Sequence, residues 1–155
     1  MRQIDLSFNQ LCSVFSLTSL PYLESASYAG NVITELKDLH LYFGNIKHID
    51  LSYNQIEKLE SFSRLYSLCQ LNMGCNKVKS VEEVKFLSNL PCLETLILTG
   101  NPVAKCVDYR VKALSYFGSR AGDLALDNEN ASVTEIDQIS ILQAIELAKT
   151  RTSGL

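Results

Sequence analysis

Apolar residues recur along this chain at fixed distances from five asparagines, Asn9, Asn31, Asn54, Asn76 and Asn101. Apolar or small residues stand eight, five and three positions before each asparagine and two positions after it, although the Asn9 unit begins late. Successive asparagines are separated by 22, 23, 22 and 25 residues. A self-similar period of this length indicates a repeat architecture, in which each unit buries its apolar face only by stacking on its neighbours.

Each unit predicts one short strand followed by a turn. The residues five and three positions before the asparagine point to the same side of a strand, which we expect to face the core. The asparagine follows where the chain leaves the strand, and its amide can satisfy backbone groups of its own turn and of the adjacent one. We therefore assign all five asparagines a buried, structural role. Further apolar positions predict short helical or 3₁₀ turns on the return path, at Val14, Leu36, Leu59 and Val81.

This spacing resembles the signature of leucine-rich repeats, in particular the short internalin-like and phosphatase-regulator-like classes. The resemblance implies an α/β solenoid with a right-handed, curved parallel sheet, short convex helical turns, a C-terminal cap and a terminal helix. We expect about five repeats over residues 1–105, the first truncated and uncapped, and the cap with its helix over residues 106–155. An uncapped repeat exposes apolar surface, so the chain is interpreted as a piece of a larger protein. Pairing of that edge with another surface is the alternative.

The regular period stops after Asn101, where the sequence is similar to the cap that follows such repeats. Tyr109 and Arg110 begin a helical pattern with apolar residues at 111, 114 and 117, and a strand-like segment at 124–127 can close the sheet. The similarity implies that Tyr109 and Arg110 are packing and capping residues.

A second helix is predicted from Thr134, an N-cap residue with Asp137 three positions later. Its apolar residues form one broad face, composed of Ile139, Ile141, Leu142, Ile145 and Ala148. This face is expected to pack back onto the cap; exposure for a partner helix is the alternative.

The composition of the chain excludes several classes of function. The 155 residues carry a net charge of −3, which argues against a nucleic-acid binder. The five cysteines lack zinc-ligand spacing, and no stretch is long and apolar enough for a membrane span, so we expect reduced thiols, a cytoplasmic location and no direct membrane insertion. Only His40 and His48 could serve acid–base chemistry, and no nucleophile motif or phosphate loop accompanies them. We predict no enzymatic activity, no cofactor and no metal.

The surface predicted to bind a partner is the concave side of the sheet, where strand residues alternate with the core. Its candidate residues are Gln3, Asp5, Ser7, Phe8, Ser25, Ser27, His48, Asp50, Ser52, Tyr53, Gln70, Asn72, Thr95 and Thr99. Exposed aromatic side chains tend to carry binding energy, which makes Phe8 and Tyr53 the candidate anchors. The alternative is that these two rings only cover adjacent turns.

Segments 42–54, 65–68, 81–84, 90–94 and 108–118 also resemble the repeats and cap of the nischarin family, the imidazoline receptor antisera-selected proteins. The resemblance, at the level of a distant relative, implies a cytosolic scaffold at endosomes or the cell cortex. It implies protein partners among integrin cytoplasmic tails, Rac and Rab GTPases and p21-activated kinases.

Two functions follow. The first is a monomeric, non-catalytic protein-interaction module. The alternative is a structural spacer between a lipid-binding PX domain and a signalling tail. The last four residues, Thr152 to Leu155, fit a PDZ-domain ligand if they form a natural terminus.

Overall fold

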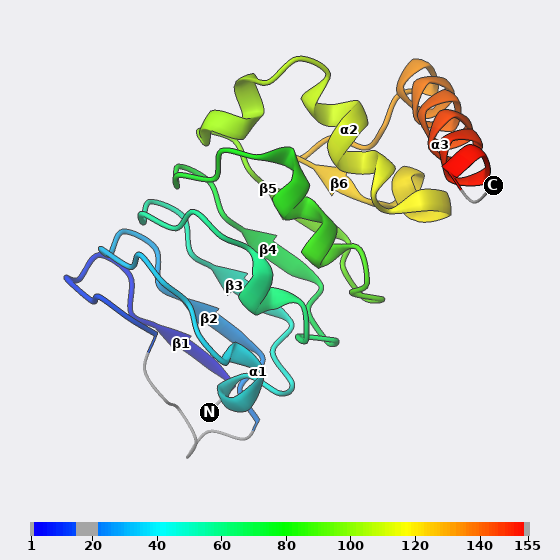
Figure 1. Cartoon of the computed structure of the whole chain (residues 1–155). Helices are drawn as coiled ribbons and strands as arrows, with labels where there is room; N and C mark the ends of the chain where they lie inside the picture. The colour runs from blue at the N-terminus through cyan, green and yellow to red at the C-terminus, as the bar shows by residue number, and fades with distance from the viewer. Residues whose placement is uncertain (1, 15–21, 154–155) are drawn as a thin grey trace.

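A computed structural model of the chain describes residues 2–14 and 22–153. Within these residues, six strands form one parallel sheet in sequence order (Figure 1). The strands are β1 (Gln3–Asp5), β2 (Ser25–Ser27), β3 (His48–Asp50), β4 (Gln70–Asn72), β5 (Thr95–Ile97) and β6 (Ala125–Leu126). The first five are in register, so that the middle residues Ile4, Ala26, Ile49, Leu71 and Leu96 form one row. The predicted parallel solenoid is confirmed.

Short helical turns lie on the return path of the last four units, on the opposite side from the strands. They are α1 (Leu39–Tyr42), η1 (Glu60–Phe62), η2 (Val81–Leu87) and η3 (Pro102–Lys105). Three of the four are 3₁₀ turns, as a period near 22 residues predicts. Ser80 caps η2, because its Oγ accepts a hydrogen bond from the Glu82 amide at 3.2 Å.

The core fills the space between the strands and these turns. In the last four units, every residue of the repeating apolar frame is buried, with an exposed fraction of at most 4%. These residues are Leu23, Ala26, Tyr28, Ile33, Ile46, Ile49, Leu51, Ile56, Leu68, Leu71, Met73, Val78, Leu93, Leu96, Leu98 and Val103. In the first unit, Ile4, Leu6 and Leu11 are only partly buried, because β1 lies at the end of the sheet.

The asparagines hydrogen-bond each turn to the turn before it. Asn54 Nδ2 donates to the carbonyl oxygens of Tyr28 in the preceding unit and Leu51 in its own, both at 3.0 Å. Its Oδ1 accepts from the Ile33 amide, also at 3.0 Å. The same three kinds of bond are made by Asn31, Asn76 and Asn101. Asn54 is therefore a buried polar group whose donors and acceptor are all satisfied.

Asn9 differs from the other four. It is exposed, and its Nδ2 donates only within its own turn, to the carbonyl oxygens of Leu6 at 3.0 Å and Ser7 at 3.1 Å. The prediction of a buried role is therefore wrong for Asn9, because no neighbouring turn covers it at this end of the sheet.

The cap consists of α2 (Tyr109–Ser115), η4 (Gly118–Asp123), β6 and α3 (Val133–Ser153). The predicted face of Val111, Leu114 and Phe117 is buried, and β6 closes the sheet by pairing with β5. Arg120 stabilises the junction, since its guanidinium donates to the carbonyl oxygens of Leu90 at 3.0 Å and of residue 93 at 3.1 Å.

Helix α3 begins at Val133, one residue before the predicted N-cap Thr134. Ser132, not Thr134, forms the capping box: its Oγ accepts from the Glu135 amide at 3.1 Å, and its own amide donates to Glu135 Oε1 at 3.0 Å. The prediction that used Thr134 and Asp137 is wrong because it placed Ser132 in the preceding loop.

The single apolar face predicted for α3 is also wrong. Ile139 is buried at 3% exposure and Leu142 is half-buried, whereas Ile141 and Ile145 point away from the protein at 60% and 45% exposure. The helix thus has two separate apolar stripes, of which one packs on the cap. Gly154 and Leu155, the last two residues of the proposed PDZ ligand, lie outside the described residues. Met1 lies outside them as well.

Candidate functional site: the concave face of the sheet

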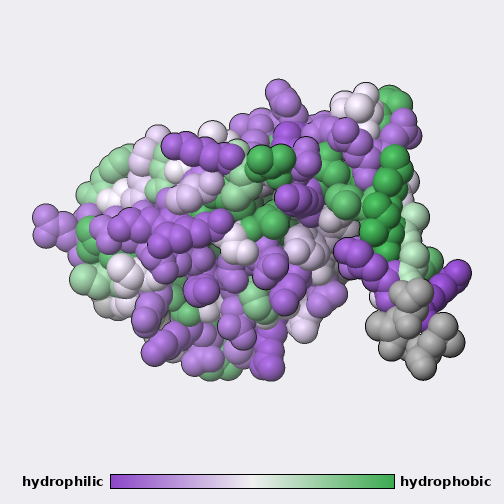
Figure 2. Space-filling view, turned by 45° about the horizontal axis from the view of Figure 1, so that its top comes forward, coloured by the Kyte–Doolittle hydropathy of each residue, from purple (hydrophilic) through white to green (hydrophobic). Residues whose placement is uncertain are grey.

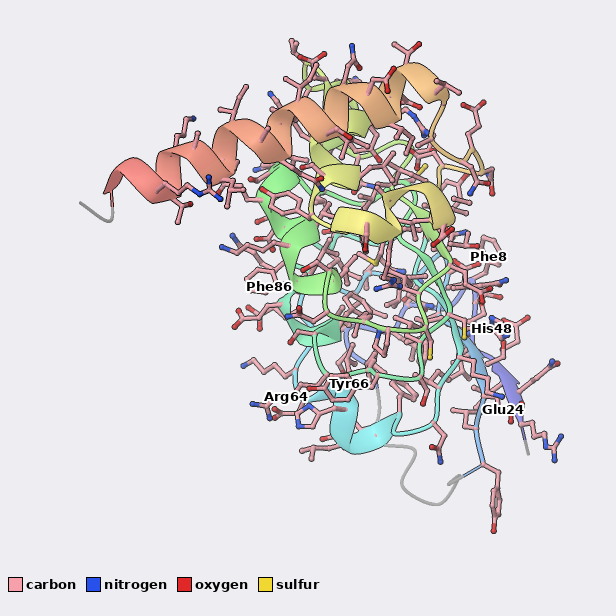
Figure 3. The ribbon with its side chains drawn as sticks, turned by 90° about the vertical axis from the view of Figure 1, so that its right-hand side faces the viewer. Phe8, Glu24, His48, Arg64, Tyr66 and Phe86 are labelled. Carbon is pink, nitrogen blue, oxygen red and sulfur yellow. The ribbon has the colours of Figure 1, made fainter. Side chains whose placement is uncertain are left out.

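The strand side of the solenoid carries a shallow pocket of about 360 Å³. It extends over the four neighbouring strands β2 to β5 and is lined by Ser25, Ala26, Ser27, His48, Ile49, Asp50, Gln70, Leu71, Asn72, Thr95 and Ile97. Figure 3 shows His48 and Glu24 on this side, while Arg64, Tyr66 and Phe86 lie on the opposite side with the helical turns. The pocket brings together seven of the fourteen residues predicted for the concave surface.

The acceptor groups of the pocket are held by local hydrogen bonds. Asp50 Oδ1 accepts from the amide of Ser52 at 2.9 Å and from its hydroxyl at 2.7 Å. In the next unit, Asn72 Oδ1 accepts from the Gly74 amide at 3.0 Å. Because these side chains are fixed before any partner arrives, less conformational entropy is lost on binding.

Asp5 repeats this arrangement outside the pocket, at the end of the sheet. Its Oδ1 accepts from the amide and the hydroxyl group of Ser7, and these hydrogen bonds lower the pKa of the Asp5 carboxyl group. The predicted candidates Gln3, Asp5 and Ser7 thus lie beside the pocket on β1 and in its following turn, and do not line it.

His48 lies at the centre of the pocket between Ser25 and Gln70, its neighbours on β2 and β4. Its ring is half-buried, and within the described residues Nδ1 is a buried atom without a hydrogen-bond partner. Such atoms are uncommon in folded proteins. No repeat pattern reveals this property, since it depends on how the ring sits between its two neighbours.

Ser52 is not a contact residue of this surface. Only 7% of Ser52 is exposed, and its hydroxyl is used by Asp50. Ala29 and Gly74, which occupy the same position in their units, are buried as well. The alternation of inward and outward residues ends with the strand, and the chain has already begun to turn at this position. Thr99, the equivalent residue after β5, is exposed but also lies outside the pocket.

The residue directly before each asparagine adopts a left-handed conformation, which sequence reasoning missed. The φ angles are 55° at Phe8, 57° at Tyr53 and 54° at Cys75, with glycines at 68° and 81° in the two other units. The signal was present, because Gly30 and Gly100 occupy this position. Phe8 and Tyr53 therefore project from the turn beyond the strands and do not line the pocket.

Both rings remain highly exposed, with exposed fractions of 79% for Phe8 and 62% for Tyr53. A Cβ atom added to Gly30 would meet the Phe8 ring at 2.6 Å, which places this ring directly over the neighbouring turn. The alternative interpretation, that the ring covers an adjacent turn, therefore describes Phe8. Tyr53 follows β3, one of the four strands that carry the pocket.

Comparison with known proteins gives the class of this fold. The family profile described as leucine rich repeat matches residues 45–103. Human leucine-rich repeat-containing protein 36 is 42% identical over 57% of the chain, and an uncharacterized leucine-rich repeat-containing protein of Schizosaccharomyces pombe is 29% identical over 85% of it. The chain spans only 12% and 22% of the length of these two relatives.

Solved structures agree. A chain in the Drosophila melanogaster SNF/U2A′ complex matches 99% of this chain and 87% of its own length, with a TM-score of 0.76 at 18% identity. A leucine-rich repeat protein of Leptospira interrogans matches 65% of this chain and 26% of its own, with a TM-score of 0.57 at 29% identity. The fold is a leucine-rich repeat solenoid.

The resemblance to nischarin is wrong. The relatives found are leucine-rich repeat-containing proteins 36, 23 and 51 and the fission-yeast protein, and none is a nischarin. Several of the segments that suggested it contain residues of the repeat frame, such as Ile49, Leu51 and Asn54, which unrelated leucine-rich repeats share. The integrin, GTPase and kinase partners, the PX domain and the endosomal location lose their basis with it.

No clustering of metal-binding side chains is found in the described part of the chain: no three His, Cys, Asp or Glu residues come close enough to hold an ion. None of the helices described is long and apolar enough to cross a membrane. Leucine-rich repeats generally serve as protein-interaction modules, and the pocket offers polar side chains on a rigid floor, which suits binding.

Proposed function

We propose that this domain is a non-catalytic protein-interaction module whose concave face binds a protein partner. The observation that carries the proposal is the set of seven polar side chains that four in-register strands hold together in one pocket. Small-molecule sites of similar volume normally bury most of the ligand. This pocket is too shallow to do so. A surface of this shape suits a peptide or a protein surface lying across the strands.

The partner is expected to provide hydrogen-bond donors to Asp50 and Asn72 and apolar contact to Ile97. Ile97 is the apolar member at the β5 end of the outward row that contains Ser27, Asp50 and Asn72. The Drosophila neighbour is a chain in a complex of two named proteins, which is compatible with a partner-binding role for this fold.

The test compares two faces of the same protein. A photo-crosslinking amino acid is placed at Gln70, on the pocket floor, or at Tyr66, which is 59% exposed on the opposite side. We expect specific crosslinks from position 70, lost when His48 and Asn72 are both replaced by alanine. The control replaces Arg64 and Ser67 by alanine, on the side of the helical turns, and should leave the crosslinks unchanged.

The alternative function, a spacer between other domains, predicts a different result. In that case position 70 gives no more crosslinks than position 66, and the alanine variants change nothing. The chain spans a small part of its longer relatives, which is compatible with this alternative.

We propose a cytoplasmic location because of the state of the cysteine thiol groups. All five cysteines are unbridged in the structure, and four of them are exposed, where an oxidising compartment would leave reactive thiols. Thiol alkylation in intact cells, compared between cytoplasmic and secreted fractions, tests this proposal.

A further inference from the structure

A second surface lies far from the concave pocket, between α3 and the helical turns. Helix α3 has 21 residues and is about 32 Å long at 1.5 Å per residue. Its first half is fixed to the cap by the buried Ile139 and by Gln143, whose Nε2 donates to the Ser115 carbonyl at 3.4 Å. Beyond Gln143 every described side chain up to residue 151 is exposed, and Figure 3 shows this end of the helix projecting past η2.

The overhang creates a groove of about 750 Å³, about twice the volume of the concave pocket. One wall is α3, and the other comes from η2 and α2. It is lined by Val81, Glu82, Lys112, Ser115, Tyr116, Leu142, Gln143, Glu146, Leu147 and Thr150. Figure 2 shows hydrophobic residues gathered along α3 on a surface that is otherwise mostly hydrophilic.

Apolar groups from three elements line this groove. Val81 and Leu142 are partly buried, Tyr116 is half-buried, and Leu147 is 54% exposed. Leu147 gains most from a partner, since about half of its surface is still in water and apolar area removed from water is the main favourable term in association.

The charges of the groove are unevenly placed. Glu82 and Glu146 both lie close enough to Tyr116 to raise the pKa of its hydroxyl group, in addition to the larger effect of burial. Lys112 also lines a small neighbouring pocket with Gln138 and Leu142, so it stands at the end near the first half of α3. Among the residues that line the groove, the two carboxylates Glu82 and Glu146 thus outnumber the cation Lys112. The Glu146 side chain pairs with Lys149, at 3.7 Å and with both side chains about 70% exposed, which is a weak interaction that a partner can replace.

We propose that this groove binds a basic amphipathic helix of a protein partner, with leucine-like side chains against Tyr116 and Leu147 and a lysine or arginine between Glu82 and Glu146. An acidic or neutral segment would bring no counter-charge to these two carboxylates once water is excluded. The proposal is independent of the concave site, because none of the groove residues lines that pocket.

The probe is a synthetic helix with leucines along one face flanked by lysines, compared with a twin in which glutamates replace the lysines. Fluorescence anisotropy with the full chain should give at least about tenfold tighter binding for the basic helix. Leu147→Ala should weaken that binding by about tenfold. Ile145→Ala is the matched control, since Ile145 is similarly exposed on the outer face of the same helix and should change it less than about twofold.

The double charge reversal Glu82→Lys with Glu146→Lys makes the sharpest comparison, because both residues are exposed and their replacement leaves the core unchanged. It should invert the preference, so that the acidic helix now binds more tightly. Equal binding of the two helices, an effect of Ile145→Ala as large as that of Leu147→Ala, or NMR shifts confined to β2–β5 would each overturn the proposal.

Discussion

The hydroxyl group of Tyr109 donates a hydrogen bond to Asp127 Oδ2 at 2.8 Å and so joins the first turn of α2 to the end of β6. The other carboxylate oxygen of Asp127 accepts from the Leu98 amide at 2.7 Å. One aspartate therefore links the last regular repeat to the cap.

Tyr109→Phe removes only the hydroxyl group of this link. We expect a loss of about 1–2 kcal/mol in the free energy of unfolding, because Asp127 loses one of its two partners in a partly buried site. Urea unfolding followed by circular dichroism measures it. Tyr116→Phe is the control, since this tyrosine is less buried and its hydroxyl group donates no hydrogen bond within the described residues of the cap; an equal loss there would contradict the role of Asp127.

A second prediction concerns the buried asparagines that hydrogen-bond each turn to the turn before it. Asn54→Leu leaves the Ile33 amide without its partner inside the protein, whereas the Tyr28 and Leu51 carbonyl groups each lose one donor and keep another, from Asn31 and Asn76. At about 1–3 kcal/mol for the unsatisfied amide and about 1 kcal/mol for each of the two lost carbonyl bonds, we expect a loss of about 3 kcal/mol in the same unfolding experiment.

Asn9→Leu is the matched control for Asn54→Leu. The same substitution at this exposed turn should cost less than about 1 kcal/mol, because only the two carbonyl groups of its own turn lose a partner and water can replace it. Equal losses at Asn9 and Asn54 would show that the amides do not act by joining neighbouring turns.

A third prediction concerns Tyr28, which is fully buried and whose hydroxyl group has no hydrogen-bond partner among the described residues. Burial raises its pKa to about 12. In the unfolded chain the group ionises near pH 10, so above this pH the unfolded state binds fewer protons and stability falls.

The contribution of Tyr28 is thus complete below pH 10 and is lost between about pH 10 and pH 12, by up to about 2–3 kcal/mol. Tyr28→Phe should remove this part of the pH dependence while changing stability little at pH 7, since no hydrogen bond is broken. Urea unfolding of both proteins at a series of alkaline pH values measures the difference. Parallel pH profiles for the two proteins would contradict the burial of this hydroxyl group.

The sequence predicted the solenoid because its period is enforced by packing: Leu51, for example, is buried by neighbours that occupy the same position in their own units. The features that the sequence did not predict depend on the backbone conformation and the hydrogen bonds within a single turn. Ser52 stands two positions before its asparagine and was assigned outward by strand alternation, but the strand has ended there. Ser132 and Thr134 are each followed three positions later by an acidic residue, and only the hydrogen bonds with Glu135 decide which one caps α3.

The nischarin resemblance failed for a related reason. The segments that suggested nischarin include residues that packing and hydrogen bonding require in any such repeat, for example Leu51 and Asn54. These residues carry little information about ancestry. The concave residues vary freely between units, as His48 and Gln70 show at equivalent positions of neighbouring strands. They are therefore the positions where a specific function can be encoded.

The last prediction uses the left-handed residue before each asparagine. Gly100 has a φ angle of 81°, and a Cβ atom added there would lie 2.7 Å from Cys75 Sγ and 3.2 Å from both the Cα and the backbone nitrogen of Cys75. Gly100→Ala should therefore cost more than the roughly 1–2 kcal/mol of the left-handed conformation alone, because the backbone of the neighbouring turn must move. Thermal and urea unfolding measure the loss.

Gly30→Ala separates the two causes. Gly30 has a similar φ angle of 68°, but the three atoms nearest to its added Cβ all belong to the ring of Phe8, the first at 2.6 Å, and this ring is exposed and can swing away. We expect Gly30→Ala to cost only the conformational part, and the double variant Phe8→Ala with Gly30→Ala to cost no more than the sum of its parts. If Gly30→Ala destabilised the protein as much as Gly100→Ala, the close approach of the Cys75 backbone would not be what makes glycine necessary at position 100.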